Sequence, residues 1–215
     1  MKVIDLTHTI YQGMPVFPGT EPPLFEPANT LEMHGYLEKK ITFYSHTGTH
    51  IDAPSHIMEN GLTLDSFAVD RFMGKGLVIN VLHIDSRTIK LTDLLPFQKQ
   101  IRNIEYLLLY TGWSHYWGQE KYFKDFPVLS LDAAEWLAQN SKLKGIGADT
   151  ISFDHESSKI FAIHKLLLEK EILILENLTN LELLLDSNFL FWGLPLKTLN
   201  ADGAPIRAVA VPQKE

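Results

Sequence analysis

The chain contains no cysteine among its 215 residues. This absence excludes disulfide bridges, thiolate metal ligands and a cysteine nucleophile. No stretch approaches the roughly 20 apolar residues that a membrane-spanning helix needs. The opening residues Met1–Leu6 also lack the long apolar core of a signal peptide. We therefore expect a cytoplasmic protein that has no membrane association.

Positive charge is also scarce. Nineteen Lys and Arg residues face 26 Asp and Glu residues, which gives a net charge of −7. No basic stripe is available to neutralise a phosphate backbone, so nucleic acid is excluded as a partner. The hydrophobic fraction of 45% and the charged fraction of 21% are ordinary for a globular protein. The length predicts one domain that covers residues 1–215.

Strand-like and helix-like segments follow one another along the chain, without an internal repeat. Hydrophobic patterns and turn residues predict strands at Lys2–Leu6, Leu37–Tyr44, Gly76–Ile84, Ile104–Tyr110, Gly145–Ala148, Ile172–Leu175, Phe189–Trp192 and Ile206–Val211. Capping residues predict helices after Thr92 as far as Leu95, at Leu131–Asn140 behind Ser130, and at Ile163–Lys170. The proline-rich stretch from Pro15 to Pro27 is interpreted as an ordered loop. The fold class is therefore α/β.

Three histidines and one carboxylate lie between His46 and His56, in the run His-Thr-Gly-Thr-His-Ile-Asp-Ala-Pro-Ser-His. Nitrogen and oxygen donors of this kind suit Zn²⁺, Mn²⁺ or Fe²⁺. In a helix, Asp52 would point away from His50, whereas a straight strand would spread His46 and Asp52 about 20 Å apart. We therefore expect a strand from Tyr36 to Ser45 that bends at Gly48 and curls over a metal, with Pro54 fixing the exit.

His164 and Glu176 frame the predicted helix at Ile163–Lys170 and the strand that follows it. The helix descends about 9 Å at 1.5 Å per residue, and the strand returns about 13 Å at roughly 3.3 Å per residue. An antiparallel return of that length places both side chains at one end of the unit. Glu176 follows the run Ile-Leu-Ile-Leu, and a carboxylate that closes such a buried strand needs a partner.

These segments resemble the metal-dependent cyclase family, whose best-known members are bacterial kynurenine formamidases. The central run is highly specific, and the His164-to-Glu176 spacing also matches. Further similar segments are Ile4-Asp5-Leu6-Thr7-His8, Gly13-Met-Pro-Val-Phe-Pro-Gly19, Thr111-Gly-Trp-Ser114 and Gly147-Ala-Asp-Thr-Ile-Ser-Phe-Asp154. The resemblance implies a single compact domain of the swivelling β/β/α type, with a mixed β core and flanking helices. It also implies a homodimer or homotetramer.

The resemblance further implies a site with two divalent metal ions, with zinc expected first and manganese or iron as alternatives. In this reading His46, His50 and Asp52 bind the first metal, His164 binds the second, and Asp52 and Glu176 bridge both. His56 donates and accepts the proton. Phe17 stands where family formamidases place a substrate-contacting tryptophan, which leaves the exact small-molecule substrate open.

The reaction expected on this basis is hydrolysis of an aryl formamide or a cyclic amide through a metal-bound hydroxide, with a histidine as general acid and base. The motifs of a serine hydrolase, Gly-x-Ser-x-Gly, and of a zinc protease, His-Glu-x-x-His, are both absent. Two alternatives stay open: a metal-binding module without catalysis, and a family cyclase or lactonase that acts on another carbonyl substrate. A closed site with four protein ligands would favour the module.

Overall fold

The structure is a computed structural model that describes residues 2–83 and 87–213. Its strands are β1 (Ile4–Asp5), β2 (Leu24–Asn29), β3 (Glu38–Thr42), β4 (His50–Asp52), β5 (Met73–Asn80), β6 (Thr88–Ile89), β7 (Tyr106–Tyr110), β8 (Val128–Leu129), β9 (Gly145–Ala148), β10 (Leu173–Glu176), β11 (Phe189–Pro195) and β12 (Gly203–Pro212). Its α-helices are α1 (Leu31–His34), α2 (Leu91–Leu94), α3 (Gln98–Ile101), α4 (Leu131–Ala138) and α5 (Ala162–Glu169). Short 3₁₀ helices connect them at Pro54–His56, Leu64–Ser66, Val69–Phe72, Leu95–Phe97, Trp113–Tyr116, Glu120–Phe123 and Leu181–Leu184.

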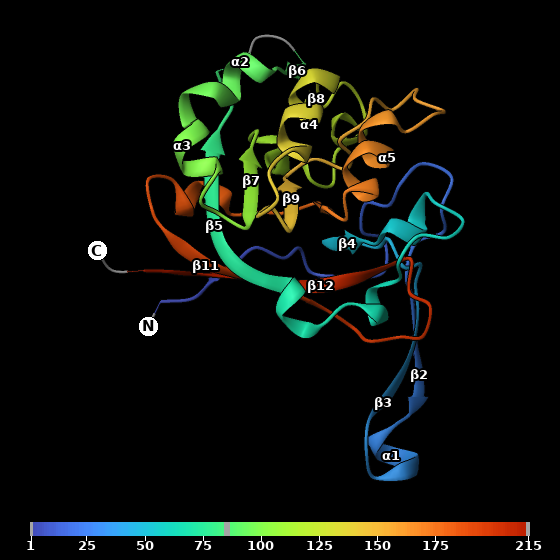
Figure 1. The fold of residues 1–215 in the computed structure, drawn as a ribbon. Helices are drawn as coiled ribbons and strands as arrows, with labels where there is room; N and C mark the ends of the chain where they lie inside the picture. Colours follow the sequence, from blue (N-terminus) through green and yellow to red (C-terminus); the bar gives the residue numbers. More distant parts are fainter. Residues whose placement is uncertain (1, 84–86, 214–215) are drawn as a thin grey trace.

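An eight-stranded mixed sheet forms the centre of the domain (Figure 1). Its order is β1-β12-β11-β5-β7-β9-β10-β4, and β4 pairs with β12 as well, so the sheet closes on itself like a barrel. The strands β5, β7, β9 and β10 run parallel to one another, and the remaining pairs in this sheet are antiparallel. Closure leaves β4 paired along both edges, which holds the residues of this short strand firmly in place.

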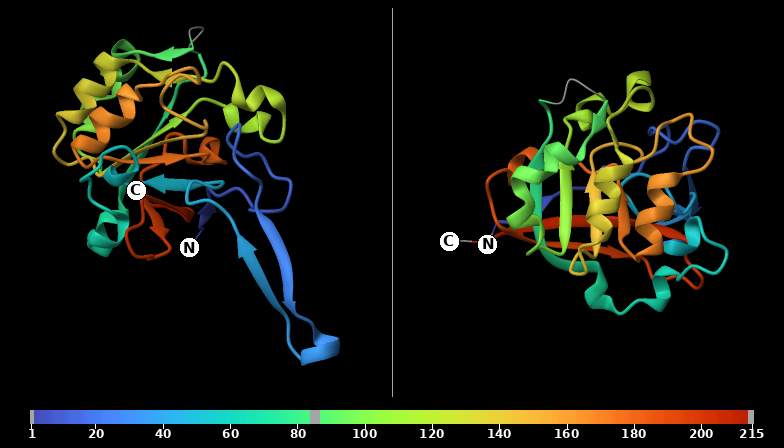
Figure 2. Two further views of the ribbon diagram at one scale, coloured as in Figure 1. Left: turned by 90° about the vertical axis from the view of Figure 1, so that its right-hand side faces the viewer. Right: turned by 45° about the horizontal axis from the view of Figure 1, so that its top comes forward.

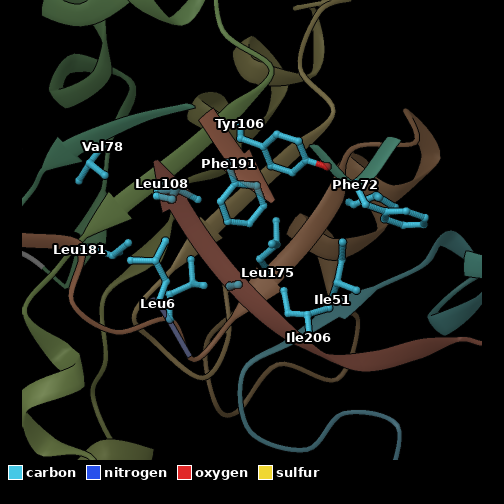
Figure 3. Close-up of a cluster of buried hydrophobic side chains, with 14 of the residues drawn as sticks. Leu6, Ile51, Phe72, Val78, Tyr106, Leu108, Leu175, Leu181, Phe191 and Ile206 are labelled. Carbon is cyan, nitrogen blue, oxygen red and sulfur yellow. The ribbon is translucent and has the colours of Figure 1, made fainter. Parts of the chain in front are cut away.

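Two large apolar clusters lie on the two faces of this sheet. The first fills the inside of the barrel-like curve, where Figure 3 shows its side chains pointing toward one another: Leu6, Ile51, Phe72, Val78, Tyr106, Leu108, Leu175, Leu181, Phe191 and Ile206. The second lies between the sheet and the helices that cover its outer face, and it includes Ala133 and Leu137 of α4 and Leu167 of α5. The α/β fold as a single compact domain is confirmed.

The predicted elements are found, with ends that shift by a few residues. Ser130 caps α4 as expected, since its side chain accepts a hydrogen bond from the backbone N–H of Ala133. The helix expected behind Thr92 begins one residue before Thr92 instead, after Lys90, whose backbone N–H donates to Asp93. The strand expected at Gly76–Ile84 begins three residues earlier and ends at Asn80, as β5 (Met73–Asn80), and Ile84 lies outside the described residues.

Two predictions about the first 50 residues are wrong. The proline-rich stretch runs into strand β2, which tolerates Pro27 because it is an edge strand of a two-stranded sheet and its register is irregular between Pro27 and Asn29. The strand expected from Tyr36 to Ser45 ends at Thr42, as β3, and does not run into the metal-binding sequence. It pairs with β2 in a separate two-stranded ribbon that projects from the body of the domain (Figure 2). The run beyond Gly48 forms its own strand, β4.

Within residues 2–83 and 87–213, no helix has the length and apolar character that crossing a bilayer requires. The cytoplasmic location stays a prediction.

Candidate metal centre

Strand β4 carries two side chains that can bind a metal, His50 and Asp52, and they lie beside a third, Glu176 of β10. In the antiparallel register of these two strands, His50 lies directly opposite Glu176, so the two side chains leave the sheet on the same face. Asp52 is two residues further along and shares that face. The Nε2 atom of His50 lies 3.3 Å from Oδ1 of Asp52 and 3.4 Å from Oε2 of Glu176.

His46 reaches the same point from the turn that precedes β4. Gly48 has a φ of +64°, a left-handed conformation that favours glycine, and it supplies the bend that the sequence required. The Nδ1 atom of His46 then lies 2.7 Å from Oδ1 of Asp52. Across the β4–β12 pair, Gly203 lies opposite Asp52. A methyl group at Gly203 would lie 2.8 Å from Nε2 of His46, so the absence of a side chain there makes room for the imidazole.

His164 comes from the first turn of α5 and meets the end of β10, as the helix–strand geometry predicted. Its Nε2 atom lies 3.1 Å from Oε1 of Glu176 and 3.7 Å from Oδ2 of Asp52. The side chains of all three residues are almost completely buried. Asp52 and His164, which are 112 residues apart in the chain, thus come within 3.7 Å of each other because β4 pairs with β10.

His56 stands at the edge of this cluster. Pro54 opens a short 3₁₀ helix, Pro54–His56, directly after β4. The ring of His56 lies 3.9 Å from that of His46 and 6.4 Å from that of His164, centroid to centroid. A third of its side chain is exposed, whereas the side chain of Asp52 is 1% exposed. His56 is therefore the histidine of this group that is most open to a molecule entering from outside.

The structure thus brings together the whole predicted set of His46, His50, Asp52, His56, His164 and Glu176. Two overlapping groups, His46–Asp52–His56 and His50–Asp52–Glu176, have ligand atoms within 4.8 Å of one another. The Oδ2 atom of Asp52 is buried and has no hydrogen-bond partner. A buried carboxylate oxygen without a partner is costly, and a cation would supply the missing interaction. The donor set and this oxygen both fit a bound metal ion.

The electrostatics of the cluster favour positive charge. Burial opposes the charged form of His50, but the carboxylates of Asp52 and Glu176 outweigh it and raise the pKa of His50 to about 10. Burial likewise opposes charge on His164, where Asp154 and Glu176 raise the pKa to about 10. For Asp52, burial is again the opposing effect, and the neighbouring histidines hold its pKa well below the ordinary value. Carboxylates that stabilise protonated imidazoles so strongly would also stabilise a divalent cation that replaces those protons.

Three further polar residues support the cluster. Asp154 accepts a hydrogen bond from Nδ1 of His164 across 2.6 Å, and Asp202 lies 3.0 Å from Nε2 of His46. Asn177 donates to the carbonyl oxygen of Gly48, which also accepts from Nδ1 of His50. Sequence analysis assigned no site role to these three. The sequence contained no signal that could have identified Asp202 as a neighbour of the cluster, because it lies 146 residues beyond His56 in a segment without histidine.

A cavity of about 400 Å³ opens above the cluster. Its walls are largely apolar and aromatic, and include Phe17, Tyr44, Trp117 and Phe161. His56, Asp202 and Glu21 also border it, while none of its described lining residues is a lysine or an arginine. Phe17 stands at this wall with about half of its surface exposed, and its contact with a substrate stays a prediction. The cluster is therefore reachable by a small molecule.

Comparison with known proteins places the chain among relatives of matching length. A family model described as "Putative cyclase" matches residues 4–155. An uncharacterised protein of Methanocaldococcus jannaschii is 35% identical over 214 residues, which cover 98% of this chain and 100% of the relative. A protein of Bacillus cytotoxicus named kynurenine formamidase is 33% identical over 211 residues, with 97% of each chain covered.

Solved structures share the fold. One titled as a potential metal-dependent hydrolase with cyclase activity superposes with a TM-score of 0.81 at 26% identity, over 100% of this chain and 99% of the other. Isatin hydrolase A from Ralstonia solanacearum superposes with a TM-score of 0.86 at 23% identity, over 97% of this chain and 91% of the other. At 23% identity, the similarity to isatin hydrolase A shows a shared fold and nothing more.

Proposed function

Because this chain belongs to the putative cyclase family, we propose that it is a metal-dependent amidohydrolase that cleaves an aryl formamide or a cyclic amide. The observation that carries the proposal is the buried Oδ2 atom of Asp52, which accepts no hydrogen bond and is set among His50, His164 and Glu176 at the base of an aromatic cavity. A formamidase name among its full-length relatives supports the amide bond as the target.

We assign His46, His50 and Asp52 to one metal ion and His164 to a second, with Asp52 and Glu176 shared by both. Zinc is the first expectation, and manganese or iron would accept the same donors. A bound divalent ion would supply Lewis acidity toward a carbonyl oxygen and would lower the pKa of a bound water.

His56 is the residue that we assign to proton transfer. Burial lowers the pKa of its imidazole below the ordinary value, so the ring is neutral at pH 7 and can accept a proton from water. Its partly exposed position beside His46 lets the same ring pass that proton to the leaving nitrogen. A purely structural metal site would need no such group, so His56 favours the enzyme over the non-catalytic module.

The lining of the cavity supports a proposal for the substrate class. Phe17, Trp117 and Phe161 offer aromatic surfaces on which an aryl ring can stack. Outside the metal-type cluster, the described lining contains the carboxylates of Glu21 and Asp202 and no lysine or arginine. We therefore propose an aromatic substrate that reaches the cluster through its amide carbonyl and whose far end is neutral or cationic.

The test combines metal analysis with turnover. Protein loaded with zinc, manganese or iron is assayed against N-formylkynurenine, isatin and formanilide, and metal content is measured by elemental analysis. We expect bound metal and hydrolysis of at least one of these amides. We also expect His56→Ala to keep its metal and lose about 10²–10⁴-fold in kcat. Metal binding without turnover of any amide would identify the non-catalytic module or a family enzyme for another carbonyl substrate.

A further inference from the structure

The carbonyl oxygen of Gly48 accepts hydrogen bonds from two side chains that lie far apart in the sequence. One comes from Nδ1 of His50 at 2.8 Å, and the other comes from Nδ2 of Asn177 at 2.9 Å. Gly48 lies in the bend before β4, where its φ of +64° is a conformation that glycine adopts freely. Because glycine can leave that conformation just as freely, the direction of this carbonyl depends on the groups that bond to it.

The bond from His50 decides which of its ring nitrogens is available to a cation. A carbonyl oxygen can only accept a hydrogen bond, so Nδ1 of His50 must carry the proton. Nε2 then faces the cluster, 3.3 Å from Oδ1 of Asp52 and 3.4 Å from Oε2 of Glu176. A neutral imidazole that is protonated at Nδ1 has its lone pair at Nε2. The carbonyl of Gly48 thus has the orienting role of the supporting groups behind metal-binding histidines.

The backbone of Asn177 is fixed in the place from which its side chain reaches Gly48. Asn177 follows Glu176 at the end of β10, is buried, and has a left-handed φ of +56°, which asparagine tolerates better than most residues. Its N–H donates to the carbonyl oxygen of Thr150 at 2.9 Å. Its own carbonyl oxygen accepts a hydrogen bond from the hydroxyl of Thr49 at 2.6 Å. These backbone bonds do not involve the Asn177 amide.

The hydroxyl of Tyr122 fixes the direction of the Asn177 amide. Since the carbonyl of Gly48 needs a donor, the amide nitrogen must face it. The amide oxygen then accepts a hydrogen bond from the Tyr122 hydroxyl at 2.7 Å. Tyr122 is completely buried, and burial raises the pKa of its hydroxyl well above the ordinary value, with the charges of Asp149 and Glu176 adding to the effect. The hydroxyl therefore keeps its proton and remains a donor.

We propose that Asn177 and Tyr122 are positioning residues for His50. Tyr122 orients the Asn177 amide. The amide holds the carbonyl of Gly48 in the direction that accepts the Nδ1 proton of His50, and Nε2 of the ring stays turned toward the cluster. A ligand ring that is already ordered binds a metal more tightly than one that must be ordered on binding. This role rests on the proposed assignment of His50 as a metal ligand and is independent of the substrate.

The first test is zinc affinity, measured by competition with a coloured chelator. Asn177→Gly removes the amide but permits the same left-handed φ and the same backbone bonds, so the chain can fold normally. We expect this variant to bind zinc about 10–100-fold more weakly than the wild type. Asn180→Gly is the matched control and should bind zinc like the wild type. Asn180 has a φ of +58°, and its amide donates to the carbonyl oxygen of Asp5 on β1.

Tyr122→Phe tests the outer hydrogen bond alone. It loses the hydroxyl and keeps the ring, which packs edge-on against Trp117 at 5.0 Å between centroids. We expect zinc affinity to fall as in Asn177→Gly but by a smaller factor, since the amide itself is retained. Tyr106→Phe is the control, because Tyr106 is equally buried and its hydroxyl donates to the carbonyl oxygen of Arg71. This control should bind zinc like the wild type.

The second measurement is the Nδ1–H signal of His50, recorded by NMR on protein with ¹⁵N-labelled histidine and assigned by its loss in His50→Gln. A buried, hydrogen-bonded proton exchanges slowly with water, so its signal is visible in the wild type. We expect the signal to disappear in Asn177→Gly and to remain in Asn180→Gly, with or without zinc. A general loss of stability would not single out this one proton.

A failure of this role and a failure of the metal site give different results. If the wild type binds zinc, equal affinity in the two glycine variants, or an unchanged signal in Asn177→Gly, shows that the amide does not position His50, and the metal site stands. Equal affinity in the two phenylalanine variants shows that Tyr122 has no part in it. If the wild type binds no zinc, the metal site is wrong. The signal of the metal-free chains then decides whether Asn177 orients the ring, and a signal that survives in Asn177→Gly overturns the proposal.

Discussion

The Nδ1 atom of His164 donates a hydrogen bond to Oδ2 of Asp154 across 2.6 Å, and both side chains are buried. Asp154 also accepts hydrogen bonds from the backbone N–H groups of Ile163 and His164, so its carboxylate is itself held at the start of α5. This arrangement fixes the tautomer of His164 and leaves its Nε2 atom facing Glu176 and Asp52. A carboxylate behind a ligand histidine is a common way to orient the ring and raise its basicity.

We predict that Asp154→Asn weakens metal binding about 10–100-fold, as loss of such supporting groups does in metal sites. The amide can still accept a hydrogen bond, but it no longer carries the charge that stabilises the imidazole ligand. Metal affinity is measured by competition with a coloured chelator. Glu156→Gln, on the same connection but outside the cluster, is the matched control and should bind metal like the wild type. If Asp154→Asn bound metal as tightly as Glu156→Gln and the wild type, Asp154 would not be an orienting residue for His164.

Gly203→Ala should displace His46. The added methyl group would lie 2.8 Å from Nε2 and 3.0 Å from Nδ1 of the imidazole, and strand pairing with β4 prevents the backbone from moving away. We expect a loss of stability of about 1–3 kcal/mol from overpacking, together with weaker metal binding. Thermal unfolding of Gly203→Ala in the wild-type and His46→Ala backgrounds separates the two effects. The destabilisation should largely disappear when the ring is absent, and its persistence would show that the ring is not the cause.

Asp52→Ala should empty the site. Asp52 is the residue that both candidate groups share, and its removal leaves His50 and Glu176 without the carboxylate between them. We expect elemental analysis to find little bound metal, whereas Phe17→Ala should retain its full metal content because Phe17 lies on the cavity wall. Two full equivalents of metal in Asp52→Ala would contradict the assignment of Asp52 as a bridging ligand.

His8 should make the fold sensitive to acid. Its ring stacks on Trp117 at a centroid distance of 4.0 Å, and its Nε2 atom is buried without a hydrogen-bond partner. Burial lowers the pKa of His8 to about 4, from an ordinary value of 6.5. Below pH 6.5 the unfolded chain therefore binds a proton that the folded chain does not, and stability falls as the pH decreases from about 6.5 to about 4.

The matching experiment compares wild type with His8→Phe, which keeps the aromatic stack and cannot titrate. Denaturant unfolding is followed from pH 7.5 to 4.5 in the presence of a chelator, so that metal binding does not contribute. We expect the variant to gain up to about 3 kcal/mol relative to wild type as the pH falls from 6.5 to 4.5, because each pH unit over which only the unfolded wild-type chain is protonated is worth about 1.4 kcal/mol. A stability difference that is constant with pH would show that His8 is not the acid-sensitive group.

The sequence was enough to identify the ligand-type residues, because the chemistry of the run from His46 to His56 is concentrated in eleven consecutive positions. It was also enough to predict that His164 and Glu176 lie together, since the lengths of a helix and a returning strand set that distance locally. The bend at Gly48 followed from the same reasoning. Side-chain period and rise per residue are properties of short segments, and this is why these predictions agree with the structure.

The tertiary structure alone decided what surrounds these residues. Whether β3 would join the central sheet or form a separate ribbon with β2 depended on which edges of the central sheet the other strands occupied. The closeness of Asp202 and Gly203 to His46 depended on the pairing of β12 with β4 across some 150 residues. Hydrogen-bonded pairing between strands is set by the closure of the whole sheet and by the burial of both of its faces. No local pattern in the chain encodes which distant strand will lie beside His50 and Asp52.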